Sequence, residues 1–490
     1  MSSEPSDKGA TRLGLSLSGG GFRATLFHFG MILALYECGL LSRVREISSV
    51  SGGSILAARM VRDWKKIFPE GDRLTDEGRK TLNDIGDELD ALARTRDLRN
   101  RVIELVPTLL LLRYAIAPVQ LVLWPIGALL EPAKRLRQGV QKWLTSSAYL
   151  SIGLRRFVRG DELGSLTPQN SLKQRDLTRG DRPNLHILVT NLTEGRPAEF
   201  TCDGFSQILH NNSHYGSNAP IVDAVAASAS FPGLVPAFEI GTHLSWFDAK
   251  AARRKRVFLS DGGISDNLGI GWFDKSETLS RIDAVLVSDA TGQPLPDSDR
   301  NITLRYAVPT LIRSLEMVSR FSNERQRLTA VHGRDGKRVY VVCIDHTHES
   351  VGELPKSLQK TLSRLRTDLD RFDSTEVRAL ILHGFHLTTA FVVEECGQLQ
   401  HEGVVPNKLS IGKDSWSKPF DGDMTDPEIR ILNRGAKREI VLDVDLWKRP
   451  TFLLGVVSWL LVLIAFSTLA RVLWSWFKNL TGFRPDVLWE

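Results

Sequence analysis

The sequence predicts an α/β protein in which helices cover a parallel sheet. Two observations predict this class. Within residues 12–61, a strand pattern, a glycine-containing turn and a helix pattern follow one another twice. Further along, short apolar and β-branched runs typical of central strands recur at 185–192, 282–290 and 338–345. Strands that alternate with helices form a parallel sheet, because each connection must cross back over the sheet.

The first strand is expected at 12–17, where leucines alternate with small residues. A run of three glycines interrupts this strand. Apolar residues at helical spacing then predict a helix over 22–38, which Gly39 closes. A second strand follows at 46–50, and a second helix begins in the serine- and glycine-rich turn after it.

The later part of the chain repeats the strand and helix signals in a less regular order. Two more strands are expected at 198–203 and 256–263. A helix is expected over 220–231, and 353–394 has the pattern of two amphipathic helices. Residues 401–446 are polar, and we expect them to be irregular.

Composition places the chain among ordinary folded proteins. Its 490 residues are 42% hydrophobic and 24% charged, which excludes a disordered or collagen-like chain. It has four cysteines, none in a C-x-x-C pair, which excludes a disulfide scaffold and argues against a cysteine zinc site. The formal net charge of +6 suits an anionic membrane surface or a nucleic acid and does not choose between them.

Residues 62–180 interrupt the alternation of strands and helices. A charged helical stretch at 71–100 leads into 103–132, which is strongly apolar but contains three prolines and Arg113. Prolines kink or break a helix, so a straight membrane span is not expected here. Kinked helices at a membrane interface, a flap over the substrate and a buried hairpin all fit this stretch, and periodicity does not separate them.

The stretch 451–470 near the C-terminus contains 20 residues without a charge. A helix of this length spans about 30 Å, the thickness of the hydrocarbon core of a bilayer. Lys448 and Arg449 precede it, Arg471 follows it, and tryptophans flank both ends as in an interfacial belt. We expect a single transmembrane helix here. Because the N-terminus has no signal-peptide pattern, the preceding residues are expected to face the cytoplasm.

Ser51 is the candidate nucleophile. It stands in SSVSGGS, directly after a strand and directly before a helix. A serine on such a sharp turn projects its hydroxyl above the edge of the sheet. The usual pattern is G-x-S-x-G; here Ser49 replaces the first glycine and Gly53 keeps the second. The competing interpretation is a helix N-cap, since serine after a strand is also a good cap.

The Gly19-Gly20-Gly21 loop also joins a strand to a helix. Backbone N–H groups in such a loop can point to one spot with a helix dipole behind them, which suits phosphate binding or an oxyanion hole. No G-K-[ST] follows, which argues against a P-loop, and the serine turn that comes next favours an oxyanion hole. Arg23, in the first turn of the helix, is a candidate ligand for a phosphate head group, with a surface salt bridge as the alternative.

Asp261 is the candidate base for the serine. It ends a strand and opens a glycine turn in LSDGGISDNLG, from where a carboxylate can face a neighbouring strand end. Asp-Gly-Gly is also an ordinary turn sequence. None of the eleven histidines stands in a motif that singles it out, and His28, within a helix, is expected to be structural.

Four segments of the chain, in this order, resemble the patatin-like phospholipases, which are related to the cytosolic phospholipases. They are LSLSGGGFRATLFHFGMILAL, SSVSGGSILAA, AASASFPGLVPAF and LSDGGISDNLG, within 12–60 and about 183–290; the likeness over 338–394 is loose. In that family a G-G-G-x-[RK] loop forms the oxyanion hole, the elbow serine is the nucleophile and the aspartate of D-G-[GA] is the sole base. The residues implied in this chain are Gly19, Gly20 and Gly21 for the hole, Ser51 as nucleophile, Asp261 as base and Arg23 at the basic position of the loop.

The resemblance implies a patatin-like parallel-sheet sandwich that hydrolyses carboxylic esters of phospholipids or related acyl lipids. The reaction it implies passes through an acyl-serine and needs no metal or cofactor. The implied partners are an acyl-lipid substrate and a lipid bilayer, and no nucleic acid is expected. Two other interpretations stay open: a catalytically silent, membrane-bound lipid-binding or scaffold protein of the same fold, and a soluble esterase for small esters.

These patterns predict six segments along the chain. They are a flexible tail at 1–11, a catalytic domain at 12–61 with 181–400, a helical and partly apolar insertion at 62–180, a polar connector at 401–450, a transmembrane anchor at 451–477 and a tail at 478–490.

Overall fold

The structure is a computed structural model of the chain, and it divides into two compact units. One unit consists of Met1–Arg99 and Ser147–Leu442, and the other of Asn100–Ser146 and Asp443–Glu490. Apart from short gaps and isolated residues elsewhere, the described residues are 11–69, 73–95, 183–201, 204–207, 219–232, 237–241, 256–274, 282–292, 338–348, 355–395 and 409–437. All of these stretches belong to the first unit.

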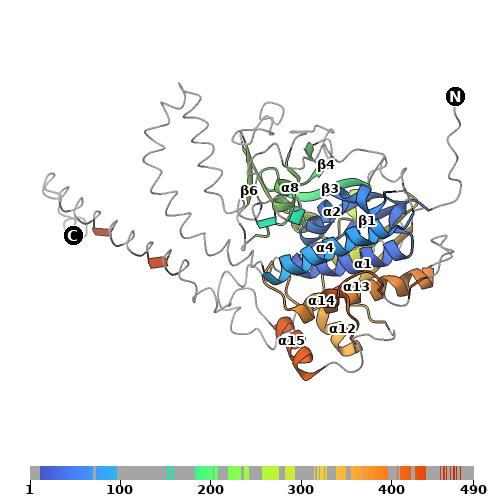
Figure 1. Cartoon of the computed structure of the whole chain (residues 1–490). Helices are drawn as coiled ribbons and strands as arrows, with labels where there is room; N and C mark the ends of the chain where they lie inside the picture. The colour runs from blue at the N-terminus through green and yellow to red at the C-terminus, as the bar shows by residue number, and fades with distance from the viewer. Residues whose placement is uncertain are drawn as a thin grey trace, which may run out of the picture. The chain divides into compact units, whose positions relative to one another are not determined.

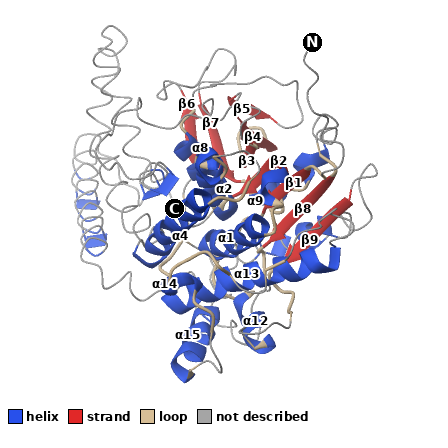
Figure 2. Cartoon of the chain, turned by 45° about the vertical axis from the view of Figure 1, so that its right-hand side comes forward, coloured by secondary structure: helices blue, strands red, loops and turns tan. Residues whose placement is uncertain are grey.

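A nine-stranded mixed sheet forms the centre of the first unit. Its main path has the order β5-β4-β3-β2-β1-β8-β9, and β7 joins it by pairing with both β3 and β6 (Figure 2). The strands from β3 to β9 along this path run parallel, so the predicted α/β class is confirmed. The strands are β1 (Leu13–Leu17), β2 (Val44–Val50), β3 (Asn184–Asn191), β4 (Arg196–Thr201), β5 (Gly204–Gln207), β6 (Phe238–Gly241), β7 (Arg256–Asp261), β8 (Ala284–Asp289) and β9 (Arg338–Cys343).

Helices connect and cover these strands, and α1, α4 and α13 lie side by side (Figure 1). Two short 3-10 turns, η1 (Leu41–Arg43) and η4 (Gly271–Asp274), complete the connections. The helices are α1 (Gly21–Glu37), α2 (Gly52–Arg62), α3 (Trp64–Ile67), α4 (Asp76–Thr95), α8 (Ile221–Ser228), α9 (Gly263–Asp266), α12 (Lys356–Leu362), α13 (Ser374–Glu395), α14 (Asp414–Ser417) and α15 (Asp426–Lys437).

The α1 and α13 helices cross at two glycines. A Cβ on Gly30 of α1 would lie 1.9 Å from the carbonyl oxygen of Ile381, and a Cβ on Gly384 of α13 would lie 2.1 Å from that of Phe27. Real Cβ atoms do not approach backbone this closely, so each helix needs glycine where the other crosses it. Both helices are buried over most of their length, which makes this crossing part of the core.

The segment that follows β7 packs against the parallel strands. The hydroxyls of Ser16 and Ser48 donate to the carbonyl oxygens of Leu268 and Gly269, at 2.5 and 2.8 Å. Apolar residues of this segment join one buried cluster with residues of β2, β3 and β8: Val50, Leu188, Leu268, Ile270, Trp272, Phe273, Ile282, Val285 and Val287. Hydrogen bonds and apolar burial together hold the residues after Asp261 on the sheet.

The structure differs from the sequence prediction between residues 401 and 446. This stretch was expected to be irregular, but it contains α15, which packs against α12 and α13. The helix is strongly amphipathic but mostly polar, and its narrow apolar stripe includes the buried Leu432 and Ala436, so the polar composition of the stretch hid it. The short strands β5 and β6 were also missed.

Two predictions fall largely on residues outside the description. They are the apolar stretch 103–132 and the transmembrane anchor 451–477, of which the structure describes only isolated residues in the second. Among the helices that the structure does describe, none combines the length and the apolar character needed to cross a membrane.

Replacing Gly30 by alanine tests the helix crossing. Helix propensity alone would favour alanine by up to about 1 kcal/mol. Because the new Cβ would collide with the backbone of α13, we expect instead a loss of about 1–3 kcal/mol in the free energy of unfolding. Urea denaturation measures the sign, and Gly384→Ala should behave in the same way. An unchanged or raised stability in both variants would contradict the crossing.

Candidate active site

Ser51 occupies a strained turn between β2 and α2. Its φ is 50° and its ψ is −116°, and it is the sole non-glycine residue with a positive φ in the described part of the chain. Such a conformation costs on the order of 1–3 kcal/mol and persists only where the surrounding structure holds it. Although Ser51 is the N-cap residue of α2, its hydroxyl makes no capping hydrogen bond. The N-cap interpretation is therefore not supported.

The Ser51 hydroxyl instead interacts with the carboxylate of Asp261, and this interaction favours the ionised carboxylate. The topology of the sheet explains this contact, because β3 pairs with β4 along one edge and with both β2 and β7 along the other. The parallel strand β2 ends at Val50, opposite Leu188, while the antiparallel strand β7 ends at Asp261, opposite Val189. The two strands thus approach end to end, and the residue after β2 meets the last residue of β7.

The Asp261 carboxylate is buried, and burial raises its pKa to about 6. Hydrogen bonds from the Ser51 hydroxyl and from the backbone N–H of Gly263 oppose this rise, the latter at 2.7 Å from Oδ1. At neutral pH the group is still mostly ionised, but it is a stronger base than an exposed aspartate. This is the electrostatic state that a general base beside a serine requires.

Small residues let the backbone around Ser51 pack closely. A Cβ on Gly52 would lie 2.1 Å from the carbonyl oxygen of Gly21, and one on Gly53 would lie 2.4 Å from that of Leu17. Ser49, at the position where the usual pattern has glycine, is buried and donates to the carbonyl of His186 at 3.2 Å. Its side chain is therefore accommodated in the turn.

The glycine loop lies beside Ser51. A Cβ on Gly19 would lie 3.4 Å from the Cβ of Ser51. Gly20 has a φ of 138° and Gly21 a φ of 57°, conformations that favour glycine and lead directly into α1. Within the described residues, the N–H groups of Gly20 and Gly21 donate to no other residue. They are the donors that the loop offers to a developing negative charge.

The N–H group of Gly19 does not point to an oxyanion hole, contrary to the sequence prediction. It donates to the backbone carbonyl of Asn267 at 3.1 Å. A donor held by a carbonyl does not serve an oxyanion, so the predicted set of three reduces to Gly20 and Gly21. The Gly19 bond instead joins the glycine loop to the segment that follows Asp261.

The N-termini of α1 and α2 converge at this point, through a residue that sequence reasoning missed. Thr25 Oγ1 lies 3.0 Å from the carbonyl oxygen of Gly21 and 2.8 Å from that of Gly52. The positive ends of both helix dipoles therefore face the region around Ser51, where they favour negative charge. A threonine one turn into the helix after a glycine loop is the only sequence signal for this role.

The sequence profile of the patatin-like phospholipases matches residues 15–273, just over half of the chain. The chain belongs to the patatin-like phospholipase family. The matched residues include the glycine loop, Ser51 and Asp261. A search of curated proteins finds no match to this chain.

Two other proteins are among the solved structures similar to this patatin-like protein. One is VipD from Legionella pneumophila, with 16% identity and a TM-score of 0.33 over 79% of this chain and 67% of VipD. The other is human GIVD cytosolic phospholipase A2, with 12% identity and a TM-score of 0.42 over 82% of this chain and 64% of that one. Its complex with methyl γ-linolenyl fluorophosphonate gives 14% and 0.41 over 80% and 60%. The chain thus spans about two thirds or less of these proteins.

Arg23 has a different environment from the one predicted for it. Its side chain is buried, and its guanidinium donates to four backbone carbonyls rather than facing the site. The carbonyls are those of Ser363, Leu365, Ala290 and Thr291, at 3.0, 2.6, 2.7 and 2.5 Å. A guanidinium whose two terminal nitrogens are both bound to carbonyls is a structural clamp, so the predicted contact with a phosphate head group is not supported.

His28 is a core residue, as the sequence suggested. Its Nε2 donates to the carbonyl of Ser18 at 2.9 Å, so its Nδ1 accepts from the hydroxyl of Ser288 at 2.6 Å. Burial lowers its pKa to about 4, which keeps the ring neutral. Within the described stretches, no group of histidine, cysteine and acidic side chains is arranged to hold a metal ion.

A buried charge cluster anchors the far end of the segment that carries Asp261. Trp272 donates to Glu199 at 2.6 Å, and its ring packs against that of His186 at a tilt of 32°. The two nitrogens of His186 lie 2.9 Å from Glu199 and 3.2 Å from Glu46. Burial lowers the pKa of His186, but both carboxylates outweigh burial and raise it. The cluster was not predicted, because its members are far apart in the sequence.

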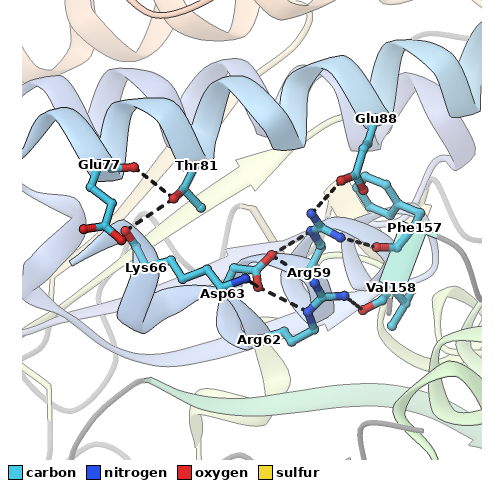
Figure 3. A network of polar contacts seen from close by, with 9 residues as sticks. All are labelled: Arg59, Arg62, Asp63, Lys66, Glu77, Thr81, Glu88, Phe157 and Val158. Atoms are coloured by element: carbon cyan, nitrogen blue, oxygen red, sulfur yellow. Dashed lines mark hydrogen bonds and ion pairs between the residues drawn. The ribbon is translucent and has the colours of Figure 1, made fainter. Parts of the chain in front are cut away.

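The far end of α2, the helix that follows Ser51, is also fixed by a polar network (Figure 3). Arg59 pairs with Asp63 and with Glu88 of α4, both at 2.9 Å. Arg59 and Arg62 donate to the carbonyls of Phe157 and Val158, at 2.9 and 2.7 Å. The network thereby fastens α4 and residues 157–158 to the helix that Ser51 begins.

Replacing Asp261 by asparagine tests the burial of its charge. The folded-state pKa of about 6 exceeds the unfolded value of 3.8, so folding stability falls as the pH rises between these values. The ionised carboxylate then costs about 3 kcal/mol at pH 7 and above. We expect Asp261→Asn to be more stable than wild type at pH 8, by up to that amount, with the gain shrinking as the pH falls below 6. Urea denaturation across this range measures it, and a gain independent of pH would contradict the assignment.

Proposed function

We propose that the chain is a membrane-associated lipid acyl hydrolase that cleaves carboxylic ester bonds of phospholipids or related acyl lipids. The observation that carries the proposal is that the strained Ser51 and the buried Asp261 stand at the meeting ends of β2 and β7, where the serine hydroxyl favours the ionised carboxylate, in a chain of the patatin-like phospholipase family. Serine is a weak nucleophile by itself, and an adjacent base activates it. Asp261 is the group placed to do so.

In the acylation step, Ser51 Oγ attacks the ester carbonyl carbon while its proton passes to Asp261. The carbonyl π electrons move to the carbonyl oxygen, which becomes the oxyanion. When this intermediate collapses, the bond from the carbonyl carbon to the alkoxy oxygen breaks, and the departing alcohol takes the proton from Asp261. The acyl group remains on Ser51.

Gly20 and Gly21 stabilise the oxyanion through their N–H groups, with the dipoles of α1 and α2 behind them. One preorganised donor of this kind is worth roughly 3–4 kcal/mol in the transition state. Water then completes the cycle: it gives a proton to Asp261 and its oxygen bonds to the acyl carbon. The carboxylic acid leaves as Ser51 Oγ regains the proton.

The substrate class follows from the family, and the membrane association from the uncharged stretch at 451–470. A span over 451–477 would keep the catalytic unit on the cytoplasmic surface, next to bilayer lipids. The competing function, a silent lipid-binding or scaffold protein, drew its support from Ser49. That serine fits the turn with its hydroxyl bonded, so the observation no longer favours it.

Ser51→Ala and Asp261→Asn should each lower hydrolysis of phospholipid vesicles by about 10³-fold or more, because each removes one half of the proton transfer. A fluorophosphonate probe should label wild type at Ser51 and not label Ser51→Ala. Wild-type kcat/KM should decline on the acid side of pH 6, where Asp261 becomes protonated.

Asp283→Asn is the matched control, since it makes the same change at an exposed carboxylate bound to Arg12. It should retain wild-type activity. Turnover that survives in both Ser51→Ala and Asp261→Asn would rule out the dyad, and a serine that the probe never labels would favour the silent scaffold.

Alkaline carbonate extraction tests the membrane span. Wild type should stay with the membrane pellet. A Leu460→Arg and Ile464→Arg double variant should move to the supernatant, because each charge at the centre of a span costs about 2.5–3.5 kcal/mol or more. Release of wild type by carbonate would remove the span from the proposal.

A further inference from the structure

The hydroxyl of another serine, Ser228, binds the strained backbone of Ser51. The N–H group of Ser51 donates to Oγ of Ser228 at 2.9 Å. The Ser228 hydroxyl in turn donates to the carbonyl of Leu188 at 2.7 Å. One hydroxyl therefore accepts from the nucleophile and donates to β3, the strand along which β2 and β7 meet.

Ser228 is fixed in its place by burial. It is the last residue of α8, it is fully buried, and α8 packs against α2, β3 and β7. Oγ of Ser54, on α2, lies 3.0 Å from Oγ of Ser228. Neither hydroxyl can turn to water, so the acceptor offered to Ser51 has a fixed position.

The same short segment also holds the backbone of Asp261. Two residues beyond Ser228, the carbonyl of Ser230 accepts the N–H of Asp261 at 3.0 Å and the hydroxyl of Ser260 at 2.8 Å. Residues 228–230 thus bond to the backbone of both members of the dyad. Their own geometry is set by the end of α8, which positions the two acceptors relative to each other.

We propose that Ser228 is a positioning residue for the nucleophile, and that residues 228–230 clamp the backbones of Ser51 and Asp261 at the separation at which their side chains meet. This inference rests on the proposed function. A residue in a positive-φ conformation relaxes when it loses a restraint, and rotation about φ would swing the hydroxyl of Ser51 away from the carboxylate. Ser228 does not touch the substrate; it acts through the backbone of Ser51.

Ser228→Ala in the full-length protein removes the acceptor without changing the chemistry of the Ser51 and Asp261 side chains. Displacement of a reacting group by about 1 Å can cost roughly 100-fold in rate. We expect kcat and the rate of fluorophosphonate labelling at Ser51 to fall by about 10–100-fold. KM should stay within about twofold, and the acid limb should move to a pH above 6, since a displaced Ser51 hydroxyl no longer lowers the pKa of Asp261.

Ser230→Ala is the matched control. It removes a buried hydroxyl from the same segment, but that hydroxyl donates to the carbonyl of Ala226 in α8, and the Ser230 carbonyl remains. It should keep the wild-type labelling rate. Equal rates in Ser228→Ala and Ser230→Ala would overturn the inference.

If Ser228→Ala does not fold, Ser228→Cys takes its place, because sulfur is a weaker acceptor of about the same shape. Labelling at least threefold slower than in Ser230→Ala then supports the positioning role, and equal labelling overturns it. Absence of labelling in wild type itself would overturn the proposed function and this inference together, whereas labelling that is insensitive to position 228 overturns only the inference.

Discussion

Two strands that approach end to end along one edge of β3 set the geometry of this protein. β2 and β7 run in opposite directions, so the residue after one meets the last residue of the other. This arrangement places a hydroxyl against a carboxylate although their segments are far apart in the chain. The glycine loop, the two helix N-termini and the segment after Asp261 are all arranged around this meeting point.

The site holds two groups in states that oppose folding. Ser51 keeps a backbone conformation that serine seldom adopts, and Asp261 keeps its charge out of water. Both states persist because the surrounding core is rigid: α1 and α13 cross at glycines, and hydroxyls fasten the loops to strand ends. The packing of the rest of the fold thus offsets the cost of the Ser51 conformation and of the buried Asp261 charge.

Local patterns predicted most strands and the positions of Ser51 and Asp261, because alternation and glycine turns are properties of adjacent residues. Partners from remote segments could not be predicted in this way. The sequence made Arg23 a candidate anion ligand, but in the structure its guanidinium donates to carbonyls of two later segments. The sequence made Gly19 a candidate oxyanion donor, but in the structure its N–H group donates to the carbonyl of Asn267. In both cases the sequence showed a donor but not the acceptor that occupies it.

The polar network at the end of α2 binds segments that lie before and after the sequence interval between Thr95 and Ser151. Arg59 pairs with Glu88 of α4, which precedes that interval, and Arg59 and Arg62 donate to the carbonyls of Phe157 and Val158, which follow it (Figure 3). The contacts that hold α2 therefore come from residues on both sides of the interval, so a change of length inside it leaves in place the anchors of the helix that follows Ser51.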